Sequence, residues 1–266
     1  QSEIIKEENE SVNFYFDKKF LNISYRDIEN FNFCLYCFYL KKNSPNSDFS
    51  SIEENPMLFG SFVHFVLDNF IKEININSRK EDLIKNLNLK STSALKKFFS
   101  DGLYPYEVEL WYKIFPKIID FFYNDLFSKH KFISEKTISK KLSNGITIKG
   151  RCDLQYSIKE KKHIVDYKTG SYLPTKSSVI SGDSLQLPFY TVLDPDVNIV
   201  EYLTINVSKN TLDCVSFSYD QLSDARKIIY DTTEKISNYI NNRTIFTAEK
   251  TSCGCEICGF EITKNI

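Results

Sequence analysis

Apolar and polar positions divide the 266-residue chain into a helical first part and a strand-rich second part. Residues 56 to 130 have a mostly helical pattern, and Met57 to Ile71 is apolar almost all round, as in a buried helix. Residues 132 to 217 contain runs rich in Ile, Val and Tyr, which predict strands. A final helix is expected from Tyr219 to Asn242. The pattern predicts an α/β protein, preceded by a polar arm over residues 1 to 20.

Two of the predicted strands are expected to form a β-hairpin. Residues 147 to 158 and 163 to 169 have strand-like composition and flank the polar run Lys159-Glu160-Lys161-Lys162. If those four residues make the turn, Ile158 pairs directly with His163. This register fixes which side chains share a face of the hairpin.

One face of this hairpin carries charged side chains. Asp153 is expected opposite Lys168, and Gln155 opposite Asp166, because directly paired residues point to the same side. A two-residue shift of register keeps Asp153, Asp166 and Lys168 on that face, whereas a one-residue shift separates Asp153 from the other two. The opposite face is the predicted core side and carries Ile148, Cys152, Leu154, Tyr156, Val165 and Tyr167.

Two carboxylates held this close repel each other, and a divalent cation between them is the simplest way to offset the repulsion. Their hard oxygen atoms favour Mg²⁺ or Mn²⁺ over a soft metal. A lysine beside them suits hydrolysis, since it can orient or help deprotonate the attacking water while the metal acts as a Lewis acid. The competing interpretation is a surface hairpin whose Asp and Lys form a solvated ion pair, worth about 0 to 1 kcal/mol.

Four short motifs occur together around this hairpin. They are Phe59-Gly60-Ser61-Phe62-Val63-His64, Gly150-Arg151-Cys152-Asp153, Asp166-Tyr167-Lys168-Thr169-Gly170 and Gln186-Leu187-Pro188-Phe189-Tyr190. The set resembles the Gly-x-x-x-His, Gly-x-x-Asp, Asp-Tyr-Lys-Thr-Gly and Gln-x-x-x-Tyr motifs of the PD-(D/E)XK nuclease superfamily. Within it, the chain resembles the RecB/AddB-type exonuclease branch, related to the CRISPR-associated adaptation exonucleases. The resemblance implies a restriction-endonuclease-like mixed sheet flanked by helices, with a helical N-terminal portion and a Cys-rich C-terminal tail.

The resemblance also implies a metal site. Its ligands would be His64, Asp153 and Asp166, which hold Mg²⁺ or Mn²⁺. Without the resemblance, a lone histidine on an apolar helix such as the one containing His64 is more often a hydrogen-bonded core residue. Glu135, in the strand-like run Phe132 to Leu142, matches a glutamate often found before the Gly-x-x-Asp motif. It is a candidate metal-site carboxylate or a neighbour of the ligands.

Three further side chains complete the implied catalytic set. Lys168 would activate water, and Gln186 and Tyr190 would position the substrate. The segment Gly182-Asp183-Ser184 is a plausible helix start, and Pro188 is tolerated near the first turn, so Gln186 and Tyr190 should point the same way. The alternative for this segment is an ordinary amphipathic helix with Tyr190 half buried.

Seven cysteines are the other chemical signal in the chain. The sequence has no N-terminal apolar signal stretch, so a disulfide framework is not expected and a reducing, cytoplasmic location is favoured. It has no run of about 20 apolar residues, so no membrane span is expected. Cys34 and Cys37 form a Cys-x-x-Cys, while Cys253, Cys255 and Cys258 crowd the tail. Thiolates clustered in this way suit zinc or an iron–sulfur cluster.

The segment from Ser24 to Leu40 is similar to the N-terminal motif of many RecB/AddB-type nucleases, which supplies one cysteine to a [4Fe–4S] cluster completed by three near the C terminus. The implied ligands are Cys34, Cys253, Cys255 and Cys258. This chain departs from the family spacing, because no cysteine follows Cys258 and Cys253 lies upstream instead. Zinc in place of iron, Cys37 in place of one ligand, and free thiols therefore all remain open.

The net charge of −1 creates no global field that draws the protein to nucleic acid. Basic side chains cluster near the proposed site instead, either as a local DNA-binding groove or as the charged face of a solvated strand. These are Lys136, Lys140, Lys141, Lys149 and Arg151.

The leading hypothesis is a Mg²⁺- or Mn²⁺-dependent DNA exonuclease that acts on single-stranded DNA or duplex ends in recombination, repair or end processing. The alternative is a non-catalytic DNA-end-binding or scaffold domain of a helicase–nuclease complex, against which the intact Asp, Asp and Lys set argues. A helicase subunit or domain is a candidate partner, and no membrane association is expected. One nuclease domain is expected over residues 21 to 266, with its helical part at about 56–130, its catalytic sheet at about 132–218 and a C-terminal helix and Cys tail at 219–266.

Overall fold

The computed structural model describes residues 11–43, 54–74, 78–99, 105–123, 129–170, 173–250 and 255–265. The contacts between residues divide the chain into two compact units. The first unit combines residues 1–49, 139–149 and 227–266, and the second combines residues 50–138 and 150–226.

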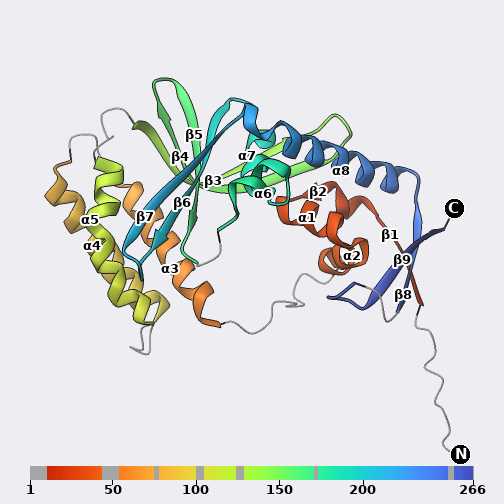
Figure 1. Cartoon of the computed structure of the whole chain (residues 1–266), viewed down its shortest axis with the longest axis horizontal. Helices are drawn as coiled ribbons and strands as arrows, with labels where there is room; N and C mark the ends of the chain where they lie inside the picture. The colour runs from red at the N-terminus through yellow and green to blue at the C-terminus, as the bar shows by residue number, and fades with distance from the viewer. Residues whose placement is uncertain are drawn as a thin grey trace, which may run out of the picture. The chain divides into compact units, whose positions relative to one another are not determined.

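The second unit is built on a mixed β-sheet (Figure 1). Its strands follow the order β3 (Lys129–Lys141), β4 (Thr147–Ile158), β5 (Lys161–Lys168), β6 (Val197–Asn206) and β7 (Thr211–Ser218). The β4–β5 and β6–β7 pairs are antiparallel, and the β5–β6 pair is parallel. A parallel pair needs a crossover connection, which here contains the helices α6 (Lys176–Ser181) and α7 (Gln186–Leu193). The predicted mixed sheet flanked by helices is confirmed.

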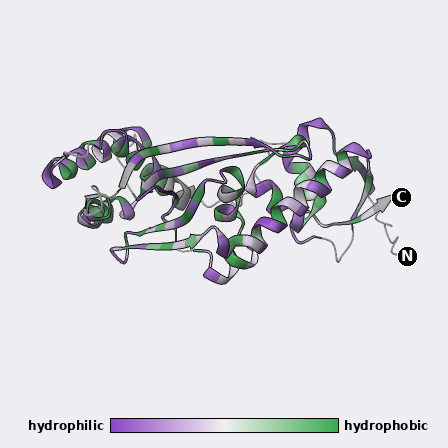
Figure 2. Cartoon of the chain, turned by 90° about the horizontal axis from the view of Figure 1, so that it is seen from above, coloured by the Kyte–Doolittle hydropathy of each residue, from purple (hydrophilic) through white to green (hydrophobic). Residues whose placement is uncertain are grey.

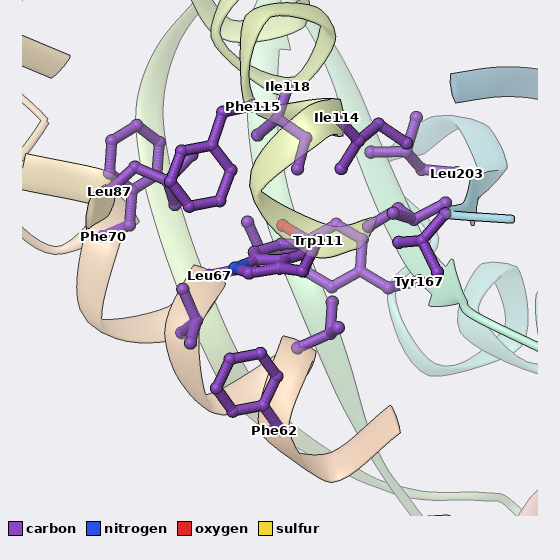
Figure 3. Close-up of a cluster of buried hydrophobic side chains, with 14 of the residues drawn as sticks. Phe62, Leu67, Phe70, Leu87, Trp111, Ile114, Phe115, Ile118, Tyr167 and Leu203 are labelled. Carbon is purple, nitrogen blue, oxygen red and sulfur yellow. The ribbon is translucent and has the colours of Figure 1, made fainter. Parts of the chain in front are cut away.

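Three helices of this unit pack against one face of the sheet, and they are α3 (Glu54–Ile71), α4 (Lys80–Phe98) and α5 (Tyr106–Tyr123). Trp111 is fully buried at the centre, where its Nε1 donates to Ser91 Oγ at 2.9 Å and its ring meets Phe62 edge-on at 6.0 Å. Figure 3 shows Tyr167 and Leu203 of the sheet gathered with these helical side chains. Along the helices hydrophilic and hydrophobic residues alternate (Figure 2), as expected for helices that bury one face.

The central hairpin is tighter than predicted. Ile158 pairs with Lys161, so Lys159 and Glu160 alone make the turn, with φ of 46° and 67°. The predicted pairing of Ile158 with His163 is therefore wrong by two residues, because the chain reverses through two left-handed residues that let β5 begin earlier. The shift is even, so the predicted faces are kept.

The first unit contains a three-stranded antiparallel sheet in the order β1, β8, β9. Its elements are β1 (Ser11–Tyr15), the 3₁₀ helix η1 (Lys18–Leu21), β2 (Asn22–Ile23), α1 (Tyr25–Phe33), α2 (Leu35–Asn43), most of α8 (Ser223–Asn241), β8 (Ile245–Lys250) and β9 (Phe260–Asn265). β2 pairs in parallel with Thr147 and Ile148 of β4. The 3₁₀ helix η2 (Asp220–Leu222) precedes α8 and belongs to the second unit.

The N-terminal residues differ from the prediction of a polar arm. Residues 11–20 instead contribute β1 and most of η1, because Phe14, Phe16 and Phe20 are buried in an aromatic cluster. Residues 1–10 lie outside the described residues. Helix α1 then begins with a capping box in which Ser24 and Asp27 satisfy each other's backbone N–H groups. No helix in the described parts of the chain is long and apolar enough to cross a membrane.

Candidate active site

Two acidic side chains lie close together at the C-terminal end of β5. Continuing the β4–β5 register one residue beyond the Leu154–Val165 pair sets Asp153 opposite Asp166. Asp153 is 8% exposed and Asp166 is 3% exposed. Asp153 Oδ2 accepts a hydrogen bond from the backbone N–H of Tyr167 at 2.7 Å, which fixes its carboxylate on the neighbouring strand.

Lys168 lies beside these carboxylates, as the sequence predicts. Its Nζ is 2.8 Å from Asp166 Oδ2 and donates to Gln186 Oε1 at 2.7 Å. The same nitrogen lies 5.2 Å from the centroid of the Tyr202 ring. The ammonium group is thus held between a carboxylate, an amide oxygen and an aromatic face.

Helix α7 places two polar side chains beside Asp166 and Lys168. The helix begins at Gln186 and carries Pro188 in its first turn, as predicted. Gln186 Nε2 donates to Asp166 Oδ1, and the Tyr190 hydroxyl lies 2.8 Å from the Arg151 carbonyl oxygen and 3.4 Å from Asp166 Oδ1. The two side chains therefore point the same way, because residues four apart share a helix face.

Helix α3 brings His64 to the same place. Its Nδ1 is 3.2 Å from Asp153 Oδ1 and 4.0 Å from Glu135 Oε1. Gly60, one turn earlier, allows this approach, since a Cβ there would lie 3.2 Å from Thr169 Oγ1. His64, Glu135 and Asp153 each offer a ligand atom within 4.8 Å of the others, a group able to hold a metal ion.

Glu135 reaches the site from an irregular point of β3. Its φ of 50° is left-handed, which is uncommon for a residue other than glycine and interrupts the alternation of side chains along a strand. Arg151 Nε lies 2.7 Å from Glu135 Oε2. Glu135, which the sequence marks as a candidate metal-site carboxylate or a neighbour of the ligands, thus belongs to the group of three side chains able to hold a metal ion.

Burial and mutual repulsion oppose the charged form of the carboxylates here, despite their ion pairs and hydrogen bonds. Burial, followed by the charge of Asp153, raises the pKa of Asp166 to about 6, and the same two causes raise the pKa of Glu135. Burial opposes the charged form of His64, but the hydrogen bond and charge of Asp153 outweigh it and raise the pKa of the imidazole.

Two buried carboxylate oxygens in the group, Asp166 Oδ2 and Glu135 Oε2, are close enough to Lys168 and Arg151 to form ion pairs but meet no donor at hydrogen-bonding geometry. Clustered carboxylate oxygens with a neutral imidazole are ligands that suit Mn²⁺, and the oxygens also suit Mg²⁺. The residues present therefore fit a divalent cation.

A family model described as the PD-(D/E)XK nuclease superfamily matches residues 22–262. The chain belongs to this superfamily. Among the solved structures that match, one titled "Crystal structure of SSO0001" is 16% identical, and the match covers 64% of this chain and 84% of that chain, at a TM-score of 0.26. A comparison with curated proteins finds no match.

In this PD-(D/E)XK protein the structure gathers all seven side chains predicted for the nuclease site. Within that set, His64, Glu135 and Asp153 form a tight group able to hold a metal ion, while the oxygens of Asp166 face Lys168, Gln186 and Tyr190. The seven are His64, Glu135, Asp153, Asp166, Lys168, Gln186 and Tyr190.

Asp68 is a site neighbour that the sequence analysis misses. Its Oδ1 accepts from Ser134 Oγ at 2.6 Å, directly before Glu135, and its charge helps to raise the pKa of Glu135 after burial and Asp153. The available signal is its position four residues after His64, which places both on one face of α3.

The cysteines of this PD-(D/E)XK protein form a second group, made entirely by the first unit. Cys34, Cys37, Cys255 and Cys258 bring their sulfur atoms within 4.8 Å of one another. Cys253, one of the four implied ligands, lies outside the described residues. Among the described cysteines, Cys37 completes the group, which is one of the alternatives that the sequence leaves open. Four thiols grouped in this way suit zinc or an iron–sulfur cluster.

Proposed function

We propose that this PD-(D/E)XK protein is a Mg²⁺- or Mn²⁺-dependent deoxyribonuclease that degrades DNA from its ends, as RecB/AddB-type exonucleases do. The observation that supports this most strongly is the meeting of Asp153, Asp166 and Lys168 in a buried group, where burial and the charge of Asp153 raise the pKa of Asp166. An ordinary solvated ion pair does not account for it, because Asp153 and Asp166 are both more than nine-tenths buried.

His64, Glu135 and Asp153 would hold the cation, with Asp166 beside them. When bound, the ion supplies Lewis-acid polarisation of the phosphodiester and lowers the pKa of a bound water. The charge excess of the carboxylates favours its binding.

The other side chains act around that centre. The Lys168 ammonium orients the attacking water and offsets charge that develops on the phosphate. The Gln186 amide contacts both Lys168 and Asp166, so it fixes their relative position. Tyr190 links Asp166 to the backbone of β4 at Arg151. Arg151 and Lys136 supply positive charge nearby for the DNA backbone.

The preference for DNA ends rests on the motif resemblance to the RecB/AddB-type branch. The same resemblance supports a role in recombination, repair or end processing and a helicase subunit or domain as partner.

The test compares linear and covalently closed circular DNA. End-labelled single-stranded and double-stranded molecules, and a closed circle, are incubated with the protein in Mg²⁺, Mn²⁺ or chelator. The variants are Asp166→Ala and Lys168→Ala. Lys162→Ala is the matched control, because Lys162 lies on the same strand and its Nζ pairs with Asp194 Oδ2 at 2.5 Å, away from the predicted site.

We expect the wild-type protein and Lys162→Ala to consume linear DNA and spare the circle, and the other two variants to be inactive. Cleavage of the circle would replace the exonuclease proposal with an endonuclease. Wild-type protein that binds DNA ends without cleaving them in any metal would instead favour a scaffold domain.

A further inference from the structure

The cysteine group joins two parts of the first unit that are far apart in the sequence. Cys34 ends helix α1 and Cys37 lies in the first turn of α2, while Cys255 and Cys258 lie in the turn that precedes β9. Cys34 Sγ is 3.8 Å from Cys258 Sγ, across a sequence separation of 224 residues, and Cys37 Sγ is 3.7 Å from Cys255 Sγ. The four thiols therefore cross-connect the α1–α2 junction and the β9 turn.

These distances distinguish one metal ion from a cluster. Four thiolates at about 2.3 Å from one tetrahedral zinc ion lie about 3.8 Å apart, and no two of them can be more than about 4.6 Å apart. The separations of 3.8 and 3.7 Å agree with the spacing around a single ion, and all four sulfur atoms lie within 4.8 Å of one another, close to that limit. In a [4Fe–4S] cluster each thiolate binds a different iron and points outward from the inorganic core, so the sulfur atoms must lie farther apart.

The backbone around the thiols supports the same conclusion. The backbone N–H of Cys37 donates to Cys34 Sγ at 3.5 Å. Hydrogen bonds of this kind orient metal-binding groups and stabilise their charged form.

The turn that carries Cys255 and Cys258 is closed by two backbone hydrogen bonds. The N–H of Gly259 donates to the Cys255 carbonyl oxygen at 2.7 Å, and the N–H of Cys255 donates to the Phe260 carbonyl oxygen at 3.0 Å. Gly259 has φ of 71°, which a glycine adopts without strain. The sequence Cys255-x-x-Cys258-Gly259 thus forms a tight turn that presents two thiols to the same point.

We propose that Cys34, Cys37, Cys255 and Cys258 bind a single zinc ion, in place of the iron–sulfur cluster that the family resemblance implies. The ion would connect the α1–α2 junction to the turn before β9, so its role is to stabilise the first unit. Binding releases the protons of the thiols that are still protonated. This proposal does not depend on the nuclease function, because all of its ligands belong to the first unit and all seven side chains predicted for the nuclease site belong to the second.

The first experiment measures zinc, iron and acid-labile sulfide per chain in full-length protein, purified without added metal and, in parallel, anaerobically from iron-supplemented cells. We expect one zinc per chain and no sulfide in both. After chelation, the protein should take up one Co²⁺ per chain with the visible absorption of tetrahedral thiolate coordination. Several irons with sulfide in the anaerobic preparation, or chelated protein that takes up neither zinc nor Co²⁺, would overturn the proposal.

Three cysteine variants identify the ligand set. Cys37→Ser should lose zinc, whereas Cys253→Ser should keep one zinc per chain. Cys214→Ser, at an exposed position on β7, is the matched control and should behave as wild type. Zinc that is kept by Cys37→Ser and lost by Cys253→Ser would contradict the proposed site.

A melting experiment covers the case in which Cys37→Ser folds poorly. Chelation should lower the melting temperature of the wild-type protein and of Cys253→Ser by a similar amount, and zinc should restore both. A wild-type melting temperature that zinc removal leaves unchanged would contradict the stabilising role.

Discussion

Two histidine–carboxylate groups lie in the second unit, and they differ in how their charges are satisfied. At the predicted nuclease site, His64 faces Asp153 and Glu135. Elsewhere on the sheet, His163 Nδ1 lies 3.4 Å from Glu201 Oε2, which also accepts from the Tyr156 hydroxyl at 2.6 Å. The other oxygen of Glu201 accepts from Ser216 Oγ at 2.7 Å, so both of its oxygens are hydrogen-bonded.

The pKa directions follow from this difference. Burial opposes ionisation of Glu201, but its hydrogen bonds with His163, Tyr156 and Ser216 outweigh it and lower the pKa of the carboxyl. At the predicted site, burial and the charge of Asp153 raise the pKa of both Asp166 and Glu135. A carboxylate whose donors outweigh burial stabilises the fold, whereas carboxylates whose burial and mutual repulsion outweigh their donors are suited to bind a cation.

The largest contrast is expected from removing one negative charge in each group. Asp166→Asn should reduce nuclease activity on the order of 10³-fold or more, because several kcal/mol of metal-assisted catalysis depend on the site. Glu201→Gln should instead reduce the free energy of unfolding by about 1 to 3 kcal/mol and leave the activity per folded molecule intact. Urea denaturation and initial cleavage rates on both variants check this contrast, which fails if Glu201→Gln also abolishes cleavage.

Lys168→Met separates catalysis from metal binding. Loss of the ammonium should lower the cleavage rate by about 10²- to 10⁴-fold, while Mn²⁺ affinity is retained or increased because a positive charge next to the carboxylates is gone. Single-turnover rates and Mn²⁺ titrations measure the two effects. Weaker Mn²⁺ binding by this variant would show that Lys168 organises the metal site itself.

Glu135→Gln tests whether the glutamate on β3 is a ligand. The Mn²⁺ affinity of Glu135→Gln should fall about 10- to 100-fold if Glu135 only supports the ligands of the metal. It should fall further if Glu135 binds the ion directly. Glu107→Gln, in the first turn of α5 and exposed, is the matched control and should bind as wild type. Equal affinities for the two variants would remove Glu135 from the site.

A matched pair of hydroxyl deletions should give smaller effects. Tyr190→Phe loses the contacts with Arg151 and Asp166, so kcat/KM should fall about tenfold with little change in stability. Tyr156→Phe loses the hydrogen bond to Glu201 and should cost about 0.5 to 1.5 kcal/mol of stability without loss of activity. A loss of stability without loss of activity in Tyr190→Phe, together with a loss of activity in Tyr156→Phe, would contradict the roles assigned to the two groups.

The pH dependence of stability should be the smallest effect. Because the folded pKa of Glu201 is lowered, its stabilisation is fully present above the unfolded pKa of about 4.3 and is lost as the pH falls through the folded pKa. The difference in unfolding free energy between wild type and Glu201→Gln should therefore shrink below about pH 4. Denaturation at a series of pH values measures it, and a difference that grows on acidification would contradict the assignment.

The sequence predicts which side chains share a face of the β4–β5 hairpin, although it does not predict the residues of the turn. Side chains on β4 and β5 alternate with a period of two, so an even error in register still places Asp153 and Asp166 on the same face. The turn itself gives no signal, because Lys159 and Glu160 adopt positive φ where Asn or Gly is the usual choice. Alternation is thus a more robust guide to the site than turn composition.

Two features of the sites depend on backbone conformations that the sequence does not indicate. Glu135 joins the ligand group through a left-handed residue within a strand, which its residue type does not favour. Among the cysteines, sequence spacing alone cannot choose between Cys37 and Cys253, since both are close to a Cys-x-x-Cys partner. Gly259 directly after Cys258 signals the tight turn that carries Cys255 and Cys258, but it does not choose between Cys37 and Cys253.

The most direct test of the central claim is a Mn²⁺ titration followed by the paramagnetic resonance signal of free Mn²⁺. It compares the wild-type protein with Asp153→Asn and Glu201→Gln, two replacements that each remove one negative charge and keep the shape of the side chain. Wild type and Glu201→Gln should bind Mn²⁺ alike, and Asp153→Asn should bind at least about 100-fold more weakly. Equal binding by all three proteins would contradict the assignment of the metal site to Asp153 and the carboxylates around it.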